Sequence, residues 1–273
     1  MTKITASDVN NLRKSTGAGM MDCKNALVEA EGNFEKAVEI LRKKGQKVAA
    51  KRADRDSSEG VALAITNNSN DVGIGIVLAC ETDFVAKNDD FVKLAYKLAD
   101  IALNCKTKDE LLNSSFGDST VVEKLTEQTG VIGEKIQIND FARIEANYVG
   151  TYIHAGNKIS SLVGFDKKAE NIETVGKDIS MQIAAMNPIA LDEKSVDPEI
   201  IEKEIEIAKD QLRTEGKPEE LIEKIAIGKL NRFFKDNTLI NQQFIKENKI
   251  SVAQYLKTFG DLKILSFSRV SIG

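Results

Sequence analysis

The segment from Gly60 to Thr82, GVALAITNNSNDVGIGIVLACET, contains two apolar runs separated by the polar turn residues 67–71. Short apolar runs bounded by turn residues are typical of buried strands, so this segment predicts an antiparallel hairpin. A second segment, VGTYIHAGNKISSLVGFDK from Val149 to Lys167, repeats the arrangement about 90 residues later.

A helical pattern follows each predicted hairpin. After the first hairpin, helical spacing from about residue 89 aligns Phe91, Leu94, Leu98, Ile101 and Ala102. After the second hairpin, the same spacing aligns Val175, Ile179, Ile183 and Met186. Because each hairpin is backed by a helix, the sequence predicts an α+β core of two related hairpin-plus-helix subdomains, at residues 55–139 and 140–273.

The residues before this core, 1–54, predict a small three-helix module and its linker. Apolar residues recur at helical spacing in three short stretches between Ile4 and Gly45, and glycine-containing breaks separate these stretches. Asn33 is suited to cap the third helix, which we expect to bury Phe34 and to end at Gly45.

Two consecutive methionines, Met20 and Met21, follow the glycine loop of this module. Neighbouring residues of a helix cannot both face a thin core, so at least one methionine should be exposed. Exposed, flexible thioethers suit a protein-binding surface, whereas the alternative is that both side chains fill gaps in the core.

Charged segments connect and extend these units. Residues 46–59 carry four basic side chains with little pattern, which indicates a solvated linker, with an RNA-contacting arm as the alternative. Residues 108–136 indicate further helix with glycine breaks, and the chain closes with a helix near residues 252–257 and a strand, LKILSFSRVSI.

A helical hairpin is predicted as an insertion at about residues 192–236. Two amphipathic stretches are split there by the glycine and proline of residues 216–218. The hairpin either projects from the core or lies on it. Its facing apolar residues should be Ile201, Ile205, Ala208 and Leu212 on one helix and Leu221, Ile225 and Leu230 on the other.

Composition narrows the class of protein. The formal net charge of −4 and the pI near 5.4 argue against a dedicated nucleic-acid binder. No apolar run approaches the roughly 18 residues of a membrane helix, and the start MTKITASDVN lacks the apolar stretch of a secretory signal. Cys23, Cys80 and Cys105 show no CxxC spacing, so we expect reduced thiols in a cytoplasmic protein whose partners are proteins.

Few residues suggest catalytic chemistry. His154 is the only histidine, and neither a GxxxxGK[ST] phosphate loop nor an HExxH motif is present. The acidic residues Glu81, Asp83, Asp89 and Asp90 lack the alternating spacing of a calcium loop. We therefore expect no cofactor and no metal, while a metal-dependent enzyme using Asp83, Asp89 and His154 is kept as an alternative.

The end of the first hairpin carries a carboxylate beside an aromatic ring. In CETDFVAKNDDF, from Cys80 to Phe91, neither Asp83 nor Phe84 has an obvious local partner. A phenylalanine after a strand usually belongs to the core, so the residues alone favour burial of Phe84.

Four segments together closely resemble the bacterial translation elongation factor Ts family. They are TGAGMMDCKNAL (Thr16–Leu27), ETDFVAKND (Glu81–Asp89), IGEKI (Ile132–Ile136) and YIHAGNKI (Tyr152–Ile159). The segments occur in the order of the family, and the resemblance extends over nearly the whole chain.

The resemblance implies a guanine nucleotide exchange factor for elongation factor Tu, which is not a covalent catalyst. Such a factor binds the GDP-bound GTPase, disturbs its magnesium and phosphate site, releases GDP and holds the nucleotide-free state until GTP binds. The N-terminal helices would form a ubiquitin-associated-like module that grips the GTPase. The family's magnesium-dislocation motif falls on Thr82, Asp83, Phe84 and Val85, and its GTPase-binding residues fall on Leu12, Met20, Met21, Ile132, Gly133 and His154.

Three points stay open beside this resemblance. The chain ends at FSRVSIG, so a contact that some family members make through an additional C-terminal helix is not carried over. The helical hairpin is sometimes called a dimerisation region, which makes a homodimer through it a further expectation. A protein-binding adaptor without exchange activity would explain Met20 and Met21 but would leave Asp83 and Phe84 unused.

Overall fold

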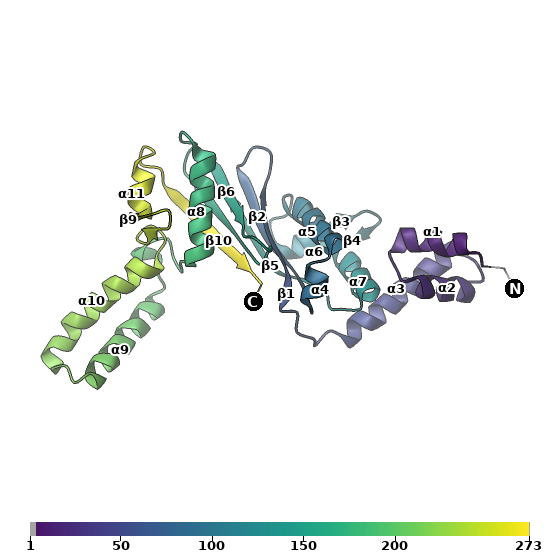
Figure 1. Ribbon diagram of the computed structural model, residues 1–273, viewed down its shortest axis with the longest axis horizontal. Coiled ribbons are helices and arrows are strands. Elements are labelled where there is room, and N and C mark those ends of the chain that lie inside the picture. Colours follow the sequence, from purple (N-terminus) through teal and green to yellow (C-terminus); the bar gives the residue numbers. More distant parts are fainter. Residues whose placement is uncertain (1–3, 273) are drawn as a thin grey trace.

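The computed structural model describes residues 4–272 and is elongated (Figure 1). Three helices lie at one end, two antiparallel sheets with flanking helices form the middle, and a pair of long helices lies at the other end. The predicted mixed α+β class, with N-terminal helices before antiparallel sheets, is confirmed. Among the described residues, no helix combines the length and the apolar character needed to cross a membrane.

The N-terminal helices are α1 (Ala6–Thr16), α2 (Met20–Glu29) and α3 (Phe34–Lys51). Thr5 and Asn33 cap α1 and α3, because their side-chain oxygens accept N–H groups of the first helical turn. The small core between the helices consists of Val9, Leu12, Ala18, Cys23, Ala26, Leu27, Ala30 and Ala37.

Two expectations for the third helix are wrong. α3 does not end at Gly45 but continues to Lys51, so part of the expected linker is helical. Gly45 lies inside the helix because α3 crosses α7 (Val121–Ile132) there, and a Cβ atom on Gly130 would lie 2.3 Å from the Cα of Gly45. Phe34 begins the helix on its outer side and is exposed, so it does not belong to the core.

The first sheet confirms the predicted hairpin and adds a third strand. Its strands run antiparallel in the order β1 (Glu59–Thr66), β2 (Val72–Cys80) and β5 (Gln137–Glu145). Val61 pairs with Leu78 and Ile65 with Ile74 across the hairpin. The buried side chains of one face pack against α5 (Asp89–Ala102), which begins and ends as the periodicity predicts.

The segment between α5 and β5 is more varied than the predicted broken helix. It contains α6 (Lys108–Asn113), the short strands β3 (Ser115–Phe116) and β4 (Ser119–Thr120), and α7. The sequence does not predict β5, because QINDFARIE mixes exposed and buried positions without a clear alternation.

The second sheet also has three antiparallel strands, in the order β10-β7-β6. They are β6 (Tyr148–Ile153), β7 (Ile159–Phe165) and β10 (Ile264–Ser271). The predicted helix is α8 (Ile172–Met186), whose Val175, Ile179 and Ile183 pack on Val163 and Phe165 of β7.

The two sheets pack face to face because β2 carries glycine where the other sheet is bulky. A Cβ atom on Gly73 would lie 2.6 Å from Cγ1 of Val149, and one on Gly75 would lie 2.8 Å from Cδ1 of Leu162. α5 and α8 cover the outer faces, which gives four layers of helix, sheet, sheet and helix (Figure 1). Burial of both sheet faces explains why β2 is a continuous apolar run.

The predicted helical hairpin is confirmed and projects from the core (Figure 1). After a short 3-10 helix, η1 (Glu193–Ser195), it consists of α9 (Pro198–Thr214) and α10 (Glu219–Asn237). Ala208 and Leu212 pack on Ile222 and Ala226. Leu221, which was expected in this contact, is exposed because its neighbour Ile222 takes the inward position. A homodimer through the hairpin stays a prediction.

The chain then returns to the second sheet. β8 (Gln243–Phe244), β9 (Glu247–Ser251) and α11 (Val252–Lys257) precede β10. The helix and the final strand predicted for this part of the chain are both present.

Candidate functional site

The short helix α4 (Asp83–Ala86) follows β2 directly and presents Phe84 to solvent. Phe84 is 84% exposed, more than any other large hydrophobic side chain in residues 4–272. The interpretation that Phe84 belongs to the core is wrong, because Ala86 and the half-buried Val85 occupy the inward side of this single helical turn. An aromatic ring left in water does little for the free protein and suits a contact with a partner.

Asp83, which was expected to lack a local partner, has one in Lys87. Nζ of Lys87, one turn later, donates a hydrogen bond to Oδ2 of Asp83 at 2.6 Å. This hydrogen bond lowers the pKa of the Asp83 carboxyl below its ordinary value, so Asp83 is charged at neutral pH. Exposed ion pairs contribute little free energy, so a partner can replace Lys87 readily.

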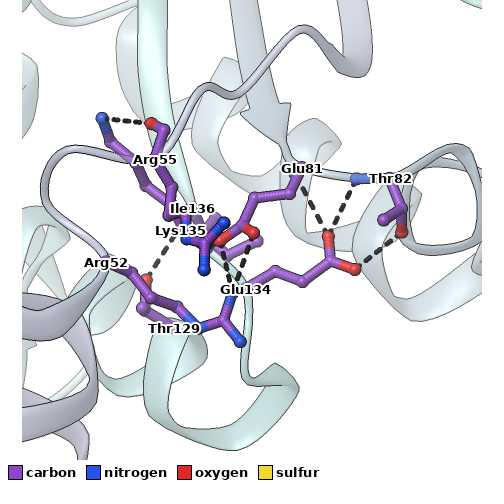
Figure 2. A network of polar contacts seen from close by, with 8 residues as sticks. All are labelled: Arg52, Arg55, Glu81, Thr82, Thr129, Glu134, Lys135 and Ile136. Atoms are coloured by element: carbon purple, nitrogen blue, oxygen red, sulfur yellow. Dashed lines mark hydrogen bonds and ion pairs between the residues drawn. The ribbon is translucent and has the colours of Figure 1, made fainter.

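Glu134, from the loop after α7, holds the residues just before α4 (Figure 2). Its Oε2 accepts the backbone N–H groups of Glu81 and Thr82 at 3.1 and 3.0 Å, and its Oε1 accepts the Thr82 hydroxyl at 2.6 Å. The Thr82 side chain makes no capping hydrogen bond to α4.

Glu81 makes a second set of bonds in the opposite direction (Figure 2). Its Oε1 accepts the backbone N–H of Lys135 at 2.6 Å, and both its oxygens accept from Nη1 of Arg52 at 2.8 Å. Partial desolvation raises the pKa of Glu81, but these hydrogen bonds outweigh it and lower the pKa overall. Nζ of Lys135 donates to the carbonyls of Ala53 and Arg55, so the end of α3 is attached to the same loop.

Ile132 and Gly133, two predicted GTPase-binding residues, lie at the end of α7 beside this network. Gly133 ends the helix with a φ of 82°, a left-handed conformation that glycine adopts without strain. Ile132 is half-buried against the core of the first sheet. The N–H of Ile136 donates to the hydroxyl of Thr129 at 3.1 Å, which fastens the loop to α7.

His154 lies in the turn between β6 and β7 and is exposed. Its Nδ1 is 3.0 Å from the hydroxyl of Tyr152. The same turn reaches the first sheet, because Nζ of Lys158 donates to the Glu59 carboxylate at 2.9 Å. Ile153 packs against the first core, to which α4 also contributes.

The structure therefore gathers most of the predicted site at one end of the first sheet. Three segments meet there, and each comes from a different part of the chain. We call this region the tip surface, and its residues are Thr82, Asp83, Phe84, Val85, Ile132, Gly133 and His154.

A second surface lies on the N-terminal helices, away from α4 (Figure 1). Met20 and Met21 are both exposed on the first turn of α2, so the alternative that both fill the core is wrong. With Ile4 and Val9 they line a groove of about 460 Å³, which we call the methionine groove. Leu12, another predicted GTPase-binding residue, does not line this groove, because its side chain is fully buried in the core of the N-terminal helices.

The described residues offer no metal centre. In residues 4–272, no three or more histidine, cysteine, aspartate or glutamate side chains are grouped so that they could hold a metal ion. Asp83, Asp89 and His154 thus do not form the site of the metal-dependent alternative. The three cysteines are free and buried, and burial raises the pKa of Cys80 to about 12.

Glu134, Glu81 and Arg52 are the site residues that sequence reasoning misses. Glu134 and Glu81 stand in the quoted motifs, but their partners lie far away in the chain, 52 residues in the case of Thr82. A bond between a side chain and a distant backbone group leaves no periodic pattern. The available signal is the position of Glu134 directly after a glycine that can end a helix.

Comparison with known proteins adds to this geometry. The family described as Elongation factor TS matches residues 81–273 of the chain. Elongation factor Ts of Christiangramia forsetii is 62% identical over 274 residues, and the alignment covers all of both chains. Elongation factor Ts of Flavobacterium psychrophilum is 57% identical with the same coverage, and that of Porphyromonas gingivalis is 42% identical over 98% of each chain. The similarity includes the N-terminal helices.

Proposed function

The chain belongs to the elongation factor Ts family, and on this premise we propose that it releases GDP from elongation factor Tu through the tip surface. It is a nucleotide exchange factor with elongation factor Tu as its partner, and it is not a catalytic enzyme. The observation that carries the proposed site is the exposure of Phe84 beside a charged Asp83.

Three units share this work in our proposal. Residues 1–54 form a ubiquitin-associated-like module that grips the GTPase, and residues 55–139 and 140–273 form two related subdomains of the core. The relation is supported by topology, since each sheet contains a hairpin and a third strand beside the hairpin's second strand. In both halves a helix follows the hairpin and covers the outer face. The helical hairpin at about 192–236 is an insertion in the second subdomain.

The rate at which GDP leaves the GTPase without a factor determines how far the barrier to release must be lowered. A nucleotide held at about 1 nM that associates at about 10⁶ M⁻¹s⁻¹ leaves at about 10⁻³ s⁻¹. Acceleration by about 10³- to 10⁴-fold requires a barrier lower by about 4 to 5.5 kcal/mol.

Phe84 supplies part of this free energy. Burying a phenylalanine side chain contributes about 1.5 to 3 kcal/mol, and the 84% exposure of Phe84 leaves nearly all of that contribution for the complex. We propose that the ring of Phe84 enters between helices of the GTPase near its metal, and we call Phe84 in this role the wedge. Asp83, released from Lys87, then competes for groups that orient the water shell of the magnesium ion.

The remaining free energy comes from contacts that stabilise the nucleotide-free GTPase. The methionine groove offers apolar, adaptable side chains for such a contact at the other end of the footprint. Because coupling between two binding sites is reciprocal, the factor weakens nucleotide binding as much as the nucleotide weakens binding of the factor.

Release of a fluorescent GDP from elongation factor Tu tests the function directly. The GTPase is loaded with the labelled nucleotide, excess unlabelled GDP is added, and the decay rate is followed against the concentration of this protein. We expect the rate to rise and to saturate at least about 10³-fold above the unaided rate. Binding without acceleration would support the adaptor alternative instead.

A further inference from the structure

We propose that Glu134 is a positioning residue for nucleotide release, because its carboxylate fixes the orientation from which α4 presents Asp83 and Phe84. Glu134 lies behind the tip surface and is half-buried. This inference rests on the proposed role of Phe84 and adds the residue that holds Phe84 in place.

α4 needs such a support because it is too short to hold itself. It spans only Asp83 to Ala86, and a single turn of helix is unstable in isolation since nucleation costs more than one hydrogen bond returns. Thr82 stands at its N-cap position but makes no capping bond with its side chain. Its hydroxyl donates a hydrogen bond to Oε1 of Glu134 at 2.6 Å, so the start of α4 is held by Glu134 and not by a side-chain cap.

The bonds of Glu134 fix two successive peptide units before α4. Its carboxylate accepts the N–H groups of Glu81 and Thr82 in addition to the hydroxyl (Figure 2). Three donors on one carboxylate define both the position and the direction in which the chain leaves β2. Hydrogen bonds to an ionised acceptor are also stronger than bonds between neutral groups.

The loop that carries Glu134 is itself attached to α7. Gly133 ends α7 directly before it, and the N–H of Ile136 returns to the hydroxyl of Thr129 on that helix. The side chain of Glu81 accepts the N–H of Lys135, so the two loops exchange carboxylate-to-backbone bonds in both directions (Figure 2). The three hydrogen bonds that Glu134 accepts from Glu81 and Thr82, which we call the clamp, therefore connect the start of α4 to the end of α7.

This arrangement predicts a specific kinetic effect for Glu134→Ala. The wider binding surface is retained, so the concentration of factor that gives half-maximal release should change less than about threefold. The maximal release rate should fall about tenfold, because the wedge is no longer held and one charge-assisted hydrogen bond is worth about that factor. Glu134→Gln keeps an oxygen for the two N–H groups and should restore most of the rate.

The experiment compares four variants in the labelled-GDP release assay: Glu134→Ala, Glu134→Gln, Phe84→Ala and, as a matched control, Glu247→Ala. Glu247 is an exposed glutamate on β9, at the far side of the core from α4 (Figure 1). Hydrogen exchange of the amides of Glu81 and Thr82 is measured on each free variant. Faster exchange of these two amides in Glu134→Ala, with the rest of the first sheet still protected, would show that the clamp opened locally.

The outcomes separate this inference from the function on which it rests. A normal rate for Phe84→Ala would overturn the role of Phe84 and the inference together. A slow Phe84→Ala with a normal Glu134→Ala would overturn the inference alone. The same holds if Glu134→Ala only raises the half-maximal concentration, or if Glu134→Gln is as slow as Glu134→Ala, because Glu134 then supports binding or folding without orienting α4.

Discussion

Replacement of Phe84 by alanine tests the proposed wedge quantitatively. Because Phe84 is 84% exposed in the free protein, its removal should change the free energy of unfolding by less than about 0.5 kcal/mol. In the complex, the same change removes the burial of an aromatic side chain, which is worth about 1.5 to 3 kcal/mol. If that free energy acts on the release step, the maximal release rate falls about 10- to 150-fold.

The assay is labelled-GDP release at saturating factor, with thermal unfolding of the free variant measured in parallel. Leu265→Ala is the matched control, because Leu265 is also an exposed apolar residue but lies on β10, outside the tip surface. The control should release GDP at the unmodified rate. The proposed role of Phe84 is overturned if Phe84→Ala keeps the full maximal release rate, or if its loss of rate follows a loss of folded protein.

Three further changes separate the remaining parts of the molecule. Replacing Met20 and Met21 by alanine should raise the concentration of factor that gives half-maximal GDP release about tenfold or more, with little change in the maximal rate, because the methionine groove contributes to binding. An unchanged half-maximal concentration would exclude the groove as a contact. Gly130→Ala should lower the free energy of unfolding, measured by urea titration, by about 1 to 3 kcal/mol, because the new Cβ would overlap α3. Gly228→Ala should be neutral or stabilising, because a Cβ at that helical position has no atom within 4 Å. Folding lowers the pKa of Glu81, so the stabilisation from its hydrogen bonds is complete above about pH 4.5 and is lost as the pH falls through the lower folded value. The protection factor of the Lys135 amide, which compares its exchange rate with the intrinsic rate at the same pH, should fall in that range and not above it.

The elements that could be predicted from the sequence are those whose patterns are local. The two hairpins and the helices α5 and α8 are marked by their own apolar spacing and turn residues. The continuation of α3 through Gly45 has no local pattern, because Gly45 is set by a close contact with the backbone of Gly130, which lies far away in the chain. Similarly, Ile222 and not Leu221 faces α9, a difference of one position that helical spacing alone does not resolve.

Only part of the candidate site could be predicted from the residues. From the residues alone Phe84 is expected in the core, and only the family resemblance indicates that the ring faces a partner. The ion pair of Asp83 with Lys87 follows from a spacing of four residues and could have been predicted. The bonds of Glu134 could not, because they depend on how α7 is placed beside β2.

The attachment of α3 has a consequence for the way the two surfaces act together. α3 is held by α7 at Gly45 and by the contacts of Arg52 and Lys135 at its end. A module on a flexible linker would lose conformational freedom when its second contact forms. In the proposed complex, these contacts of α3 set the distance between the methionine groove and Phe84 before binding, so that the second contact requires little further ordering. On the proposed mechanism, this fixed spacing favours a GTPase whose two binding sites lie at the matching distance.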